Sequence, residues 1–361
     1  MSPRVVATVD LSAIRHNLRQ VRARAPGSRV MAAVKADAYG HGAVPVARTL
    51  AAAGVDALAV ACMEEALVLR RAHVGGAIAL LEGILSAEEA AMAVYEQLDV
   101  VLHDHWQIDL LHALGPTAQI RIWFKLDTGM HRLGFPLEDV PRLQAALAAH
   151  PRWEFAGWMT HLACADDPDD SFTALQIDRF STALQGVAGP RSIANSAGLL
   201  AWPQTHVDWV RPGLALYGAS PLASQPALQL GLKPAMTVES RLIAVRQFAA
   251  GESLGYGRQY FCPEAMPVGV VAIGYADGLP RAVSSGAEVS INGQPLPLAG
   301  RVSMDMITVD LRNMPSAKVG STVQIWGPGL PAERLAEAAN TIVYELFCGL
   351  TQRVRFQHRN G

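Results

Sequence analysis

The sequence has little charge, and that shortage excludes one class of partner. Of its 361 residues only 17% are Asp, Glu, Lys or Arg, and 30 basic side chains against 32 acidic ones give a net charge of −2. Proteins that bind nucleic acids usually carry a basic patch or run. The sequence shows none, so we expect no nucleic-acid partner.

Cysteine is equally scarce. Cys62, Cys164, Cys262 and Cys348 lie far apart and form no C-x-x-C pair. Their spacing excludes a zinc knuckle and a dithiol redox motif, and no metal site is predicted. The spread fits reduced thiols in a cytosolic protein better than a disulfide framework.

Long apolar segments are also missing. The opening residues MSPRVVATVDLSAI have neither the apolar core nor the small-residue cleavage site of a signal peptide. The longest stretch without charge, 212–232, contains three prolines and is too polar for a membrane helix, which needs about 20 mostly apolar residues. We therefore expect a soluble, cytoplasmic protein without a membrane partner.

Half of the residues are hydrophobic, and up to about residue 212 they follow a repeating pattern. Short apolar runs typical of buried strands alternate with amphipathic stretches typical of helices. The runs lie at 29–35, 55–61, 77–82, 98–103, 119–126, 154–161, 191–196 and 206–212. Eight such units predict a (β/α)8 TIM-type barrel with its site at the carboxyl ends of the strands.

A doubly wound open sheet is the alternative arrangement of the same elements. Open sheets that bind dinucleotides carry G-x-G-x-x-G after their first strand, and this sequence has neither that motif there nor a Walker A sequence. The missing glycine motifs favour the barrel.

Beyond the barrel pattern, short strands are separated by turn residues. Asn292-Gly293 is a dipeptide typical of a two-residue hairpin turn. We predict a mostly-β domain at 228–361 after a barrel at 12–227, and we expect a strand within 1–11 to join the β domain.

Lys35 ends the first apolar run and opens the segment AAVKADAYGHG at 32–42. The plain interpretation is a lysine at a barrel rim whose stem lies along apolar surface. The functional interpretation is an amine that forms a Schiff base with an aldehyde cofactor such as pyridoxal phosphate. Tyr39, four residues later, could then donate its hydroxyl to a phosphate.

A second segment, KLDTGMHRLGF at 125–135, also follows an apolar run. Arg132 could bind a carboxylate through its planar guanidinium, or it could lie in a surface salt bridge. An ammonium on Lys125 would repel Arg132 in a partly buried site, which motivates the prediction that Lys125 is carbamylated. The alternative is a plain amine paired with Asp127.

Three further run ends carry polar residues. Ser196 and the amides around Gly213 would suit an anion such as phosphate. Arg211 is either part of an ion pair or a cation beside a pyridine nitrogen. His161, taken singly, is more often a structural histidine.

In the β domain, AIGYADGLPR at 272–281 places Tyr275 between two glycine-containing turns, and GRVSMDMITVDL follows at 300–311. Tyr275 is either a core aromatic residue or a phenol placed for proton transfer. The segment alone does not decide between the two.

Taken together and in order, these segments resemble the bacterial alanine racemases. The resemblance rests on AVKADAYGHG, KLDTGMHRLGF, NSAG, VRPGLALYGASP, GYADGLPR and GRVSMDMITVDL and covers essentially the whole chain. It implies a pyridoxal-phosphate isomerase of fold type III that interconverts L-alanine and D-alanine. It also implies a homodimer in which the partner's β domain completes each active site.

The resemblance assigns roles to individual residues. Lys35 would carry the cofactor, and Tyr275 from the other subunit would be the second catalytic base. It further implies contacts with the cofactor by Tyr39, His161, Ser196, Arg211, Gly213 and Leu214, contacts with the substrate by Arg132 and Met304, and carbamylation of Lys125.

Two departures and several alternatives remain. Gln352 and Arg355 stand where many relatives have a phosphate-binding Tyr and a Pro, so the phosphate could lose one hydroxyl partner. A fold-type-III decarboxylase would pair the ring nitrogen with Glu, a broad-specificity racemase would share the fold, and a single-domain pyridoxal-phosphate-binding protein would lack the β domain. The sequence leaves open whether D-alanine is made for peptidoglycan or broken down.

Overall fold

The computed structural model describes residues 3–114 and 118–361, which divide into two compact units. We call them the barrel unit, which comprises residues 15–216 and 220–231, and the β unit, which comprises residues 3–14, 217–219 and 232–361. Each unit is described by itself.

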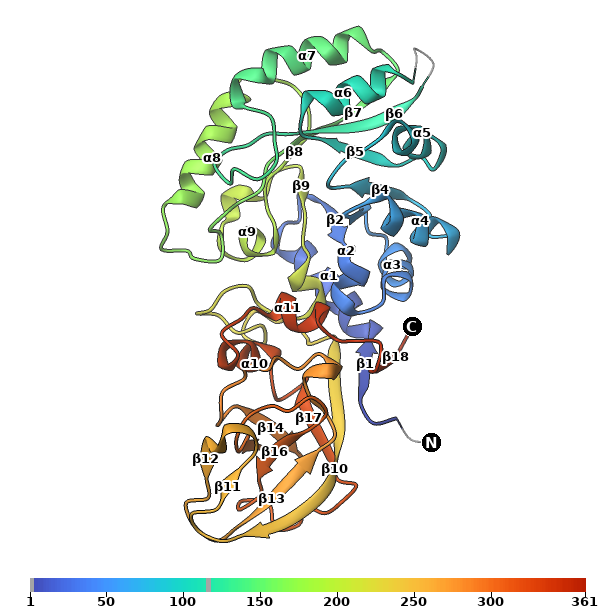
Figure 1. The fold of residues 1–361 in the computed structure, drawn as a ribbon. Helices are drawn as coiled ribbons and strands as arrows, with labels where there is room; N and C mark the ends of the chain where they lie inside the picture. The colour runs from blue at the N-terminus through green and yellow to red at the C-terminus, as the bar shows by residue number, and fades with distance from the viewer. Residues whose placement is uncertain (1–2, 115–117) are drawn as a thin grey trace. The chain divides into compact units, whose positions relative to one another are not determined.

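The barrel unit is a closed ring of eight parallel strands (Figure 1), which confirms the predicted barrel. Pairing of the last strand with the first, Val30 opposite Val210, closes the ring. The strands are β2 (Arg29–Ala33), β3 (Ala57–Val60), β4 (Ala77–Leu80), β5 (Asp99–Leu102), β6 (Ile120–Lys125), β7 (Trp153–Met159), β8 (Arg191–Ser192) and β9 (Trp209–Val210).

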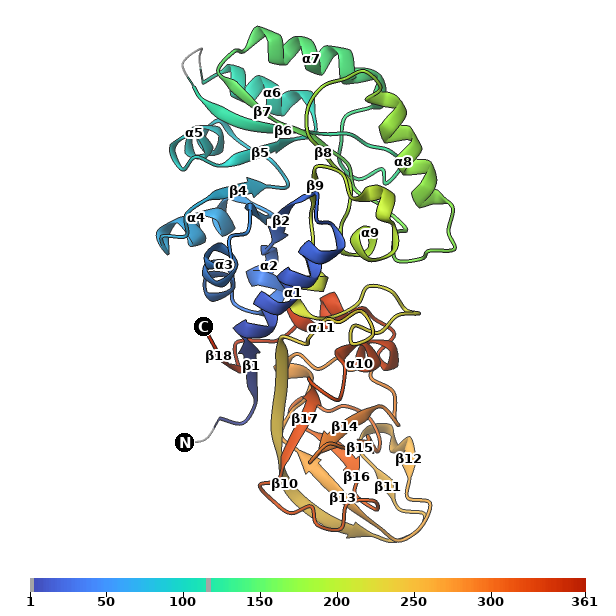
Figure 2. The same ribbon diagram turned by 180° about the vertical axis from the view of Figure 1, so that it is seen from behind.

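Helices follow the strands from β2 to β8 and surround the ring (Figures 1 and 2). Side-chain oxygens of Ser86, Asp104 and Asn195 accept hydrogen bonds from backbone amides two or three residues later, and so begin three of the helices. The helices are α1 (Leu11–Arg24), α2 (Lys35–Gly40), α3 (Ala43–Ala52), α4 (Met63–Arg71), α5 (Ala87–Tyr95), α6 (His105–His112), α7 (Val140–Ala149), α8 (Phe172–Ala183) and α9 (Ser196–Ala201), with 3-10 turns η1 (Leu137–Asp139), η2 (Pro203–Thr205) and η3 (Leu214–Tyr217).

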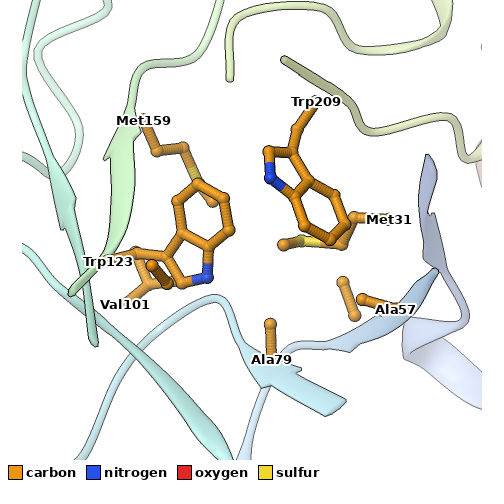
Figure 3. Packing of buried hydrophobic residues seen from close by; sticks show 9 residues of the cluster. Met31, Ala57, Ala79, Val101, Trp123, Met159 and Trp209 are labelled. Carbon is orange, nitrogen blue, oxygen red and sulfur yellow. The ribbon is translucent and has the colours of Figure 1, made fainter. Parts of the chain in front are cut away.

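Large and small side chains share the interior of the barrel. Trp123 and Trp209 meet edge to face with ring centroids 5.6 Å apart, while β3 and β4 contribute Ala57 and Ala79 (Figure 3). Because indole rings from β6 and β9 occupy most of the space, the strands between β2 and β5 carry alanines. The filled interior leaves the strand ends as the place for chemistry.

The β unit is built around β10 (Met236–Phe248), a strand of 13 residues. β1 (Val6–Asp10) pairs antiparallel with β10 and parallel with β18 (Arg355–Arg359). The other elements are β11 (Ser253–Leu254), η4 (Tyr256–Arg258), β12 (Tyr260–Phe261), β13 (Met266–Val271), η5 (Tyr275–Asp277), β14 (Glu288–Ile291), β15 (Gln294–Pro297), β16 (Ile307–Asp310), β17 (Thr322–Trp326), α10 (Ala332–Ala338) and α11 (Val343–Cys348).

The predicted hairpin turn is present between β14 and β15. Asn292 and Gly293 have φ angles of 52° and 80°, the left-handed conformation that a type I′ turn needs at both positions. Among the described residues, no helix is long and apolar enough to span a membrane.

Candidate active site

Lys35 lies at the start of a strained turn at the carboxyl end of β2. The next four residues, Ala36 to Tyr39, have φ angles between 51° and 55° and ψ angles between 43° and 53°, so they form one turn of left-handed helix. Residues with a side chain pay roughly 1–2 kcal/mol each in this conformation. Such strain persists only where the surroundings enforce it, and it is concentrated at functional sites.

Hydrogen bonds hold this turn at both ends. At its start, the Ala36 amide donates to Glu65 Oε1 over 2.6 Å. At its end, the Ala43 amide donates to Asp37 Oδ1 over 2.6 Å, and the His41 ring nitrogen Nδ1 lies 2.8 Å from the Tyr39 carbonyl oxygen. Side-chain and backbone hydrogen bonds together therefore hold four non-glycine residues in the left-handed conformation.

Tyr39, Ser196 and Gly213 meet at the barrel mouth although they come from three different loops. A Cβ atom at Gly213 would lie 2.2 Å from the Tyr39 hydroxyl, so a larger residue there would displace Tyr39. Ser196 Oγ accepts hydrogen bonds from the amides of Gly213 at 2.9 Å and Ala215 at 3.2 Å. Leu214, between these amides, is buried. Two hydroxyls beside backbone amides form a cradle suited to an anion.

Arg211 follows β9 and is only 7% exposed. Its guanidinium donates to the Ser192 hydroxyl at 2.6 Å and to the carbonyl oxygens of Thr160 and Ile193. These partners are neutral, so none of them balances the buried positive charge. Burial lowers the pKa of Arg211 to about 10. A cation held by neutral acceptors is suited to face a ligand atom that carries a lone pair.

His161 lies beside Arg211, with its Nδ1 atom 3.4 Å from the guanidinium Nη2 atom. Burial, and then the positive charges of Arg211 and Lys125, lower the pKa of His161 well below its ordinary value. The imidazole is therefore neutral near pH 7. If Nδ1 accepts from Arg211, Nε2 carries the proton and can donate to a further group.

Lys125 is the last residue of β6 and is surrounded by cations. Burial lowers its pKa to about 8, with further contributions from Arg211, Arg132 and Lys35. Asp127 accepts hydrogen bonds from the amides of Gly129 and His131 and from the His131 ring, so its carboxylate organises the loop that presents Arg132. The Asp127 carboxylate also acts on Lys125 and raises its pKa, but burial and the neighbouring cations outweigh it.

Tyr275 belongs to the β unit, in the 3-10 turn η5, and its side chain reaches solvent: the residue is 38% exposed. Its amide donates to the Ser303 carbonyl oxygen at 3.0 Å, and the next amide, Ala276, donates to the Met304 carbonyl oxygen at 2.9 Å. A Cβ atom at Gly274 would lie 2.3 Å from the Ser303 oxygen. The turn thus packs directly against the segment that carries Met304.

Asp277, at the end of the same turn, is 1% exposed and ties three segments together. Its Oδ2 atom accepts from the Gly274 amide at 3.0 Å and from Arg4, while Oδ1 lies 3.3 Å from Arg353 Nε. The Thr351 hydroxyl donates to the Ala276 carbonyl oxygen at 2.8 Å. The turn of Tyr275 is therefore bound to both the first and the last segments of the β unit.

Comparison with known proteins places both units in one family. Residues 9–221 match the model of the alanine racemase N-terminal domain, and residues 235–358 match that of the C-terminal domain. The chain belongs to the alanine racemase family. It is 50% identical over 352 residues to the alanine racemase of Nitrosococcus oceani, covering 96% of this chain and 97% of that protein, and 47% identical over 363 residues to that of Halorhodospira halophila, covering 100% and 99%.

Solved structures of alanine racemases are also similar to this chain. The biosynthetic alanine racemase of Pseudomonas aeruginosa has a TM-score of 0.95 at 43% identity, covering 99% of this chain and 100% of that chain. The alanine racemase of Bartonella henselae, whose structure contains covalently bound pyridoxal phosphate, has a TM-score of 0.89 at 31% identity, with the same coverage. This racemase is therefore an isomerase that interconverts L-alanine and D-alanine, as the motifs predict.

The barrel unit brings most of the predicted site residues together. Tyr39 lies beside Gly213, which is hydrogen-bonded to Ser196. Arg211 lies beside His161. The positive charges of Lys35, Arg132 and Arg211 lower the pKa of Lys125. Tyr275 and Met304 lie side by side in the β unit.

The sequence did not point to the residues that hold the predicted site residues in place. Glu65 binds the Lys35 turn, Ser192 binds Arg211, and Asp277 with Arg4 and Arg353 binds the Tyr275 turn. The only signal available was weak, because a Glu in the first turn of a helix or an Asp in a glycine-rich turn is common. Their partners lie 19 or more residues away, except within η5 itself, and such pairings do not follow from local pattern.

Proposed function

We propose that this racemase carries pyridoxal phosphate on Lys35 and moves the α-proton of alanine with two bases, Lys35 and the partner subunit's Tyr275. The strained turn that begins directly after Lys35 is the observation that most supports this assignment. When bound, pyridoxal phosphate supplies an electron sink conjugated to the substrate's α-carbon. The chain's own residues would then do the holding, orienting and proton transfer.

The residues at the barrel mouth fit this cofactor. Tyr39, Ser196, Gly213 and Leu214 would hold the phosphate, at a place where a Cβ atom on Gly213 would collide with the Tyr39 hydroxyl and where Ser196 Oγ accepts from the Gly213 amide. Arg211, which has only neutral partners among its hydrogen bonds, would donate to the pyridine nitrogen. A donor that keeps its proton leaves that nitrogen uncharged, which weakens the electron sink and disfavours decarboxylation and transamination.

Racemisation needs a base on each face of the α-carbon. For L-alanine, the Tyr275 oxygen would take the proton and the Lys35 amine would return one to the opposite face, and D-alanine would reverse the roles. Each positioned acid or base contributes typically about 10²–10⁴-fold in rate. The neutral His161, with its Nε2–H free to donate while Nδ1 accepts from Arg211, would help to lower the basicity of the phenol oxygen.

Arg132 and Met304 would contact the substrate, with the guanidinium of Arg132 on the carboxylate. We propose that Lys125 is carbamylated to hold Arg132 in place. A pKa of about 8 leaves part of the Lys125 amine neutral near pH 7, which is the form that attacks carbon dioxide. The amine nitrogen bonds to the carbon, one proton leaves to solvent, and the resulting carbamate replaces a positive charge with a negative one.

The finer biological setting is also a proposal. A homodimer follows from the proposed role of the partner subunit's Tyr275, and its dissociation on dilution should remove activity. A cytoplasmic enzyme that provides D-alanine for peptidoglycan, or degrades it, is consistent with a family that acts on free alanine.

One experiment tests the assignment of Lys35. Purified protein loaded with pyridoxal phosphate is reduced with borohydride, and the labelled peptide is identified by mass spectrometry. We expect the label on Lys35, and we expect Lys35→Ala to show no covalent label and almost no racemisation of alanine. Label on another lysine, or normal activity of Lys35→Ala, would overturn the proposal. A panel of L-amino acids, serine included, measures the strictness for alanine.

A further inference from the structure

Three consecutive strand-to-helix loops of the barrel share one side-chain device. In each, a Glu or Gln in the first turn of the helix reaches back to the backbone amide four residues earlier. Glu65 Oε2 accepts from Ala61 at 2.8 Å, and Glu89 Oε2 accepts from Leu85 at 2.8 Å. Gln107 Oε1 accepts from the amide of His103 at 2.9 Å. The device closes the loop after β3, β4 and β5 in turn.

The three residues differ in what the rest of the side chain does. Glu65 uses its other oxygen on the loop after β2, where it accepts from the Ala36 amide at 2.6 Å. Gln107 similarly donates from Nε2 to the carbonyl oxygens of Glu82 and Ile84 in the loop after β4. The bond recorded for the carboxylate of Glu89 stays within its own loop. Glu65 and Glu89 therefore form a natural pair that differs mainly in one contact.

The additional contact of Glu65, with the Ala36 amide, lies next to Lys35. Ala36 is the first residue of the left-handed turn and the direct neighbour of Lys35. α2 and α4 both contact β3 and also contact each other, so Glu65 can bridge the two loops. Without an acceptor for its amide, Ala36 would lose the side-chain contact at the start of the turn that opposes relaxation to an ordinary conformation, and Lys35 would turn with it.

We propose that Glu65 is a positioning residue for Lys35: its carboxylate clamps the amides of Ala61 and Ala36 and so enforces the left-handed turn that aims the Lys35 amine. The inference rests on the proposed attachment of pyridoxal phosphate to Lys35. It extends that function because it assigns the direction of the lysine to a residue of the neighbouring loop.

The test compares Glu65→Gln with Glu89→Gln in otherwise identical full-length protein. Apoenzyme is mixed with pyridoxal phosphate, and the rate of covalent attachment to Lys35 is followed by absorbance and by borohydride trapping. A glutamine can accept at one amide but presents N–H groups to the other. We expect attachment to slow roughly 10- to 100-fold in Glu65→Gln, the order of loss that about an ångström of misplacement produces. Glu89→Gln should attach at the wild-type rate.

Two further measurements separate positioning from general support of the fold. Hydrogen exchange of the Ala36 amide should be faster in Glu65→Gln and unchanged in Glu89→Gln. Adding Ala36→Gly to Glu65→Gln should restore part of the attachment rate, because glycine adopts the left-handed conformation without the Cβ penalty. If Glu65→Gln does not fold, Glu65→Asp carries the comparison, since the shorter carboxylate reaches only one of the two amides.

The outcomes are distinguishable. Equal attachment rates in the variants of Glu65 and Glu89, or unchanged exchange at Ala36, would overturn the role of Glu65 alone. Attachment at a residue other than Lys35 in wild-type protein would instead overturn the proposed function, whatever the Glu65 variants do.

Discussion

The turns that carry Lys35 and Tyr275 are held in place by different kinds of contact. Each must hold a long side chain in a single direction at the end of a short turn. The Lys35 turn adopts a left-handed conformation with non-glycine residues and is held by Glu65 and Asp37. The Tyr275 turn has ordinary backbone and is held by close packing of Gly274 and by the buried carboxylate of Asp277.

The difference shows where each turn obtains its rigidity. The Lys35 turn stores strain, so its geometry should respond sharply to loss of one acceptor. The Tyr275 turn has an ion-paired carboxylate with several partners, so its geometry should weaken gradually. Both place a carboxylate beside the backbone rather than beside the reactive atom, which leaves the amine and the phenol free for chemistry.

Removing the phenol oxygen of Tyr275 should cause the largest loss of activity. We expect Tyr275→Phe to lower racemisation by about 10²–10⁴-fold, since one positioned base is lost. The value of kcat/KM must fall equally in both directions because L- and D-alanine have equal free energies. In deuterated water, however, α-hydrogen exchange should persist for D-alanine, which Lys35 serves, and disappear for L-alanine. Proton NMR of each enantiomer checks this. Exchange of L-alanine at the wild-type rate would refute the role of Tyr275.

Loosening the Tyr275 turn should cost less than deleting its phenol. Asp277→Asn removes the charge that binds Arg4 and Arg353, and we expect kcat to fall about tenfold through misplacement of Tyr275. Stability should fall by about 1–3 kcal/mol, toward the lower end because both arginines are more than a third exposed. Urea unfolding and steady-state kinetics measure the two effects.

Asp310→Asn is the matched control for that variant. Asp310 is also buried, at 5% exposure, and also binds an arginine, Arg312, through its carboxylate. We expect a similar loss of stability with normal kcat in the folded protein. Equal losses of kcat in both variants would show that Asp277 only supports the fold.

Carbamylation of Lys125 should affect the binding of the substrate through Arg132. Lys125→Ala should raise KM for alanine roughly two- to fivefold, as expected for loss of a partly exposed charge pair with Arg132. Because only the neutral amine reacts, the carbamylated fraction should rise with pH toward the pKa of about 8. Intact mass spectrometry of protein kept with and without carbon dioxide measures the modification. An unmodified amine in both samples would contradict it.

Protonation of His161 should make the free energy of unfolding depend weakly on pH. Its pKa is lowered in the folded protein by burial and by Arg211, so the unfolded chain binds a proton that the folded chain excludes. Stability should therefore be full above the ordinary imidazole pKa of about 6.5 and fall as the pH drops below it. Urea unfolding at several pH values should show a shallower decline in His161→Gln. An identical decline in the variant would rule out His161 as the source.

The architecture and the residues that carry the chemistry can be predicted from the order of the residues alone. Eight apolar runs spaced by amphipathic stretches are enough for a parallel barrel, because strand and helix periods differ and parallel strands need crossovers. Since strand carboxyl ends share one face of a barrel, Lys35, Lys125, His161 and Arg211 could be expected at one mouth from their positions alone.

The contacts that hold these residues become visible only in the folded chain. The left-handed turn after Lys35 contains ordinary residues, so no propensity predicts it, and one of the contacts that hold it comes from a carboxylate 29 residues away, which accepts the Ala36 amide. Arg211 could as well have met an acid, and its neutral surroundings depend on which loops close around it. Such contacts arise between segments distant in sequence, where packing rather than local pattern sets the partner.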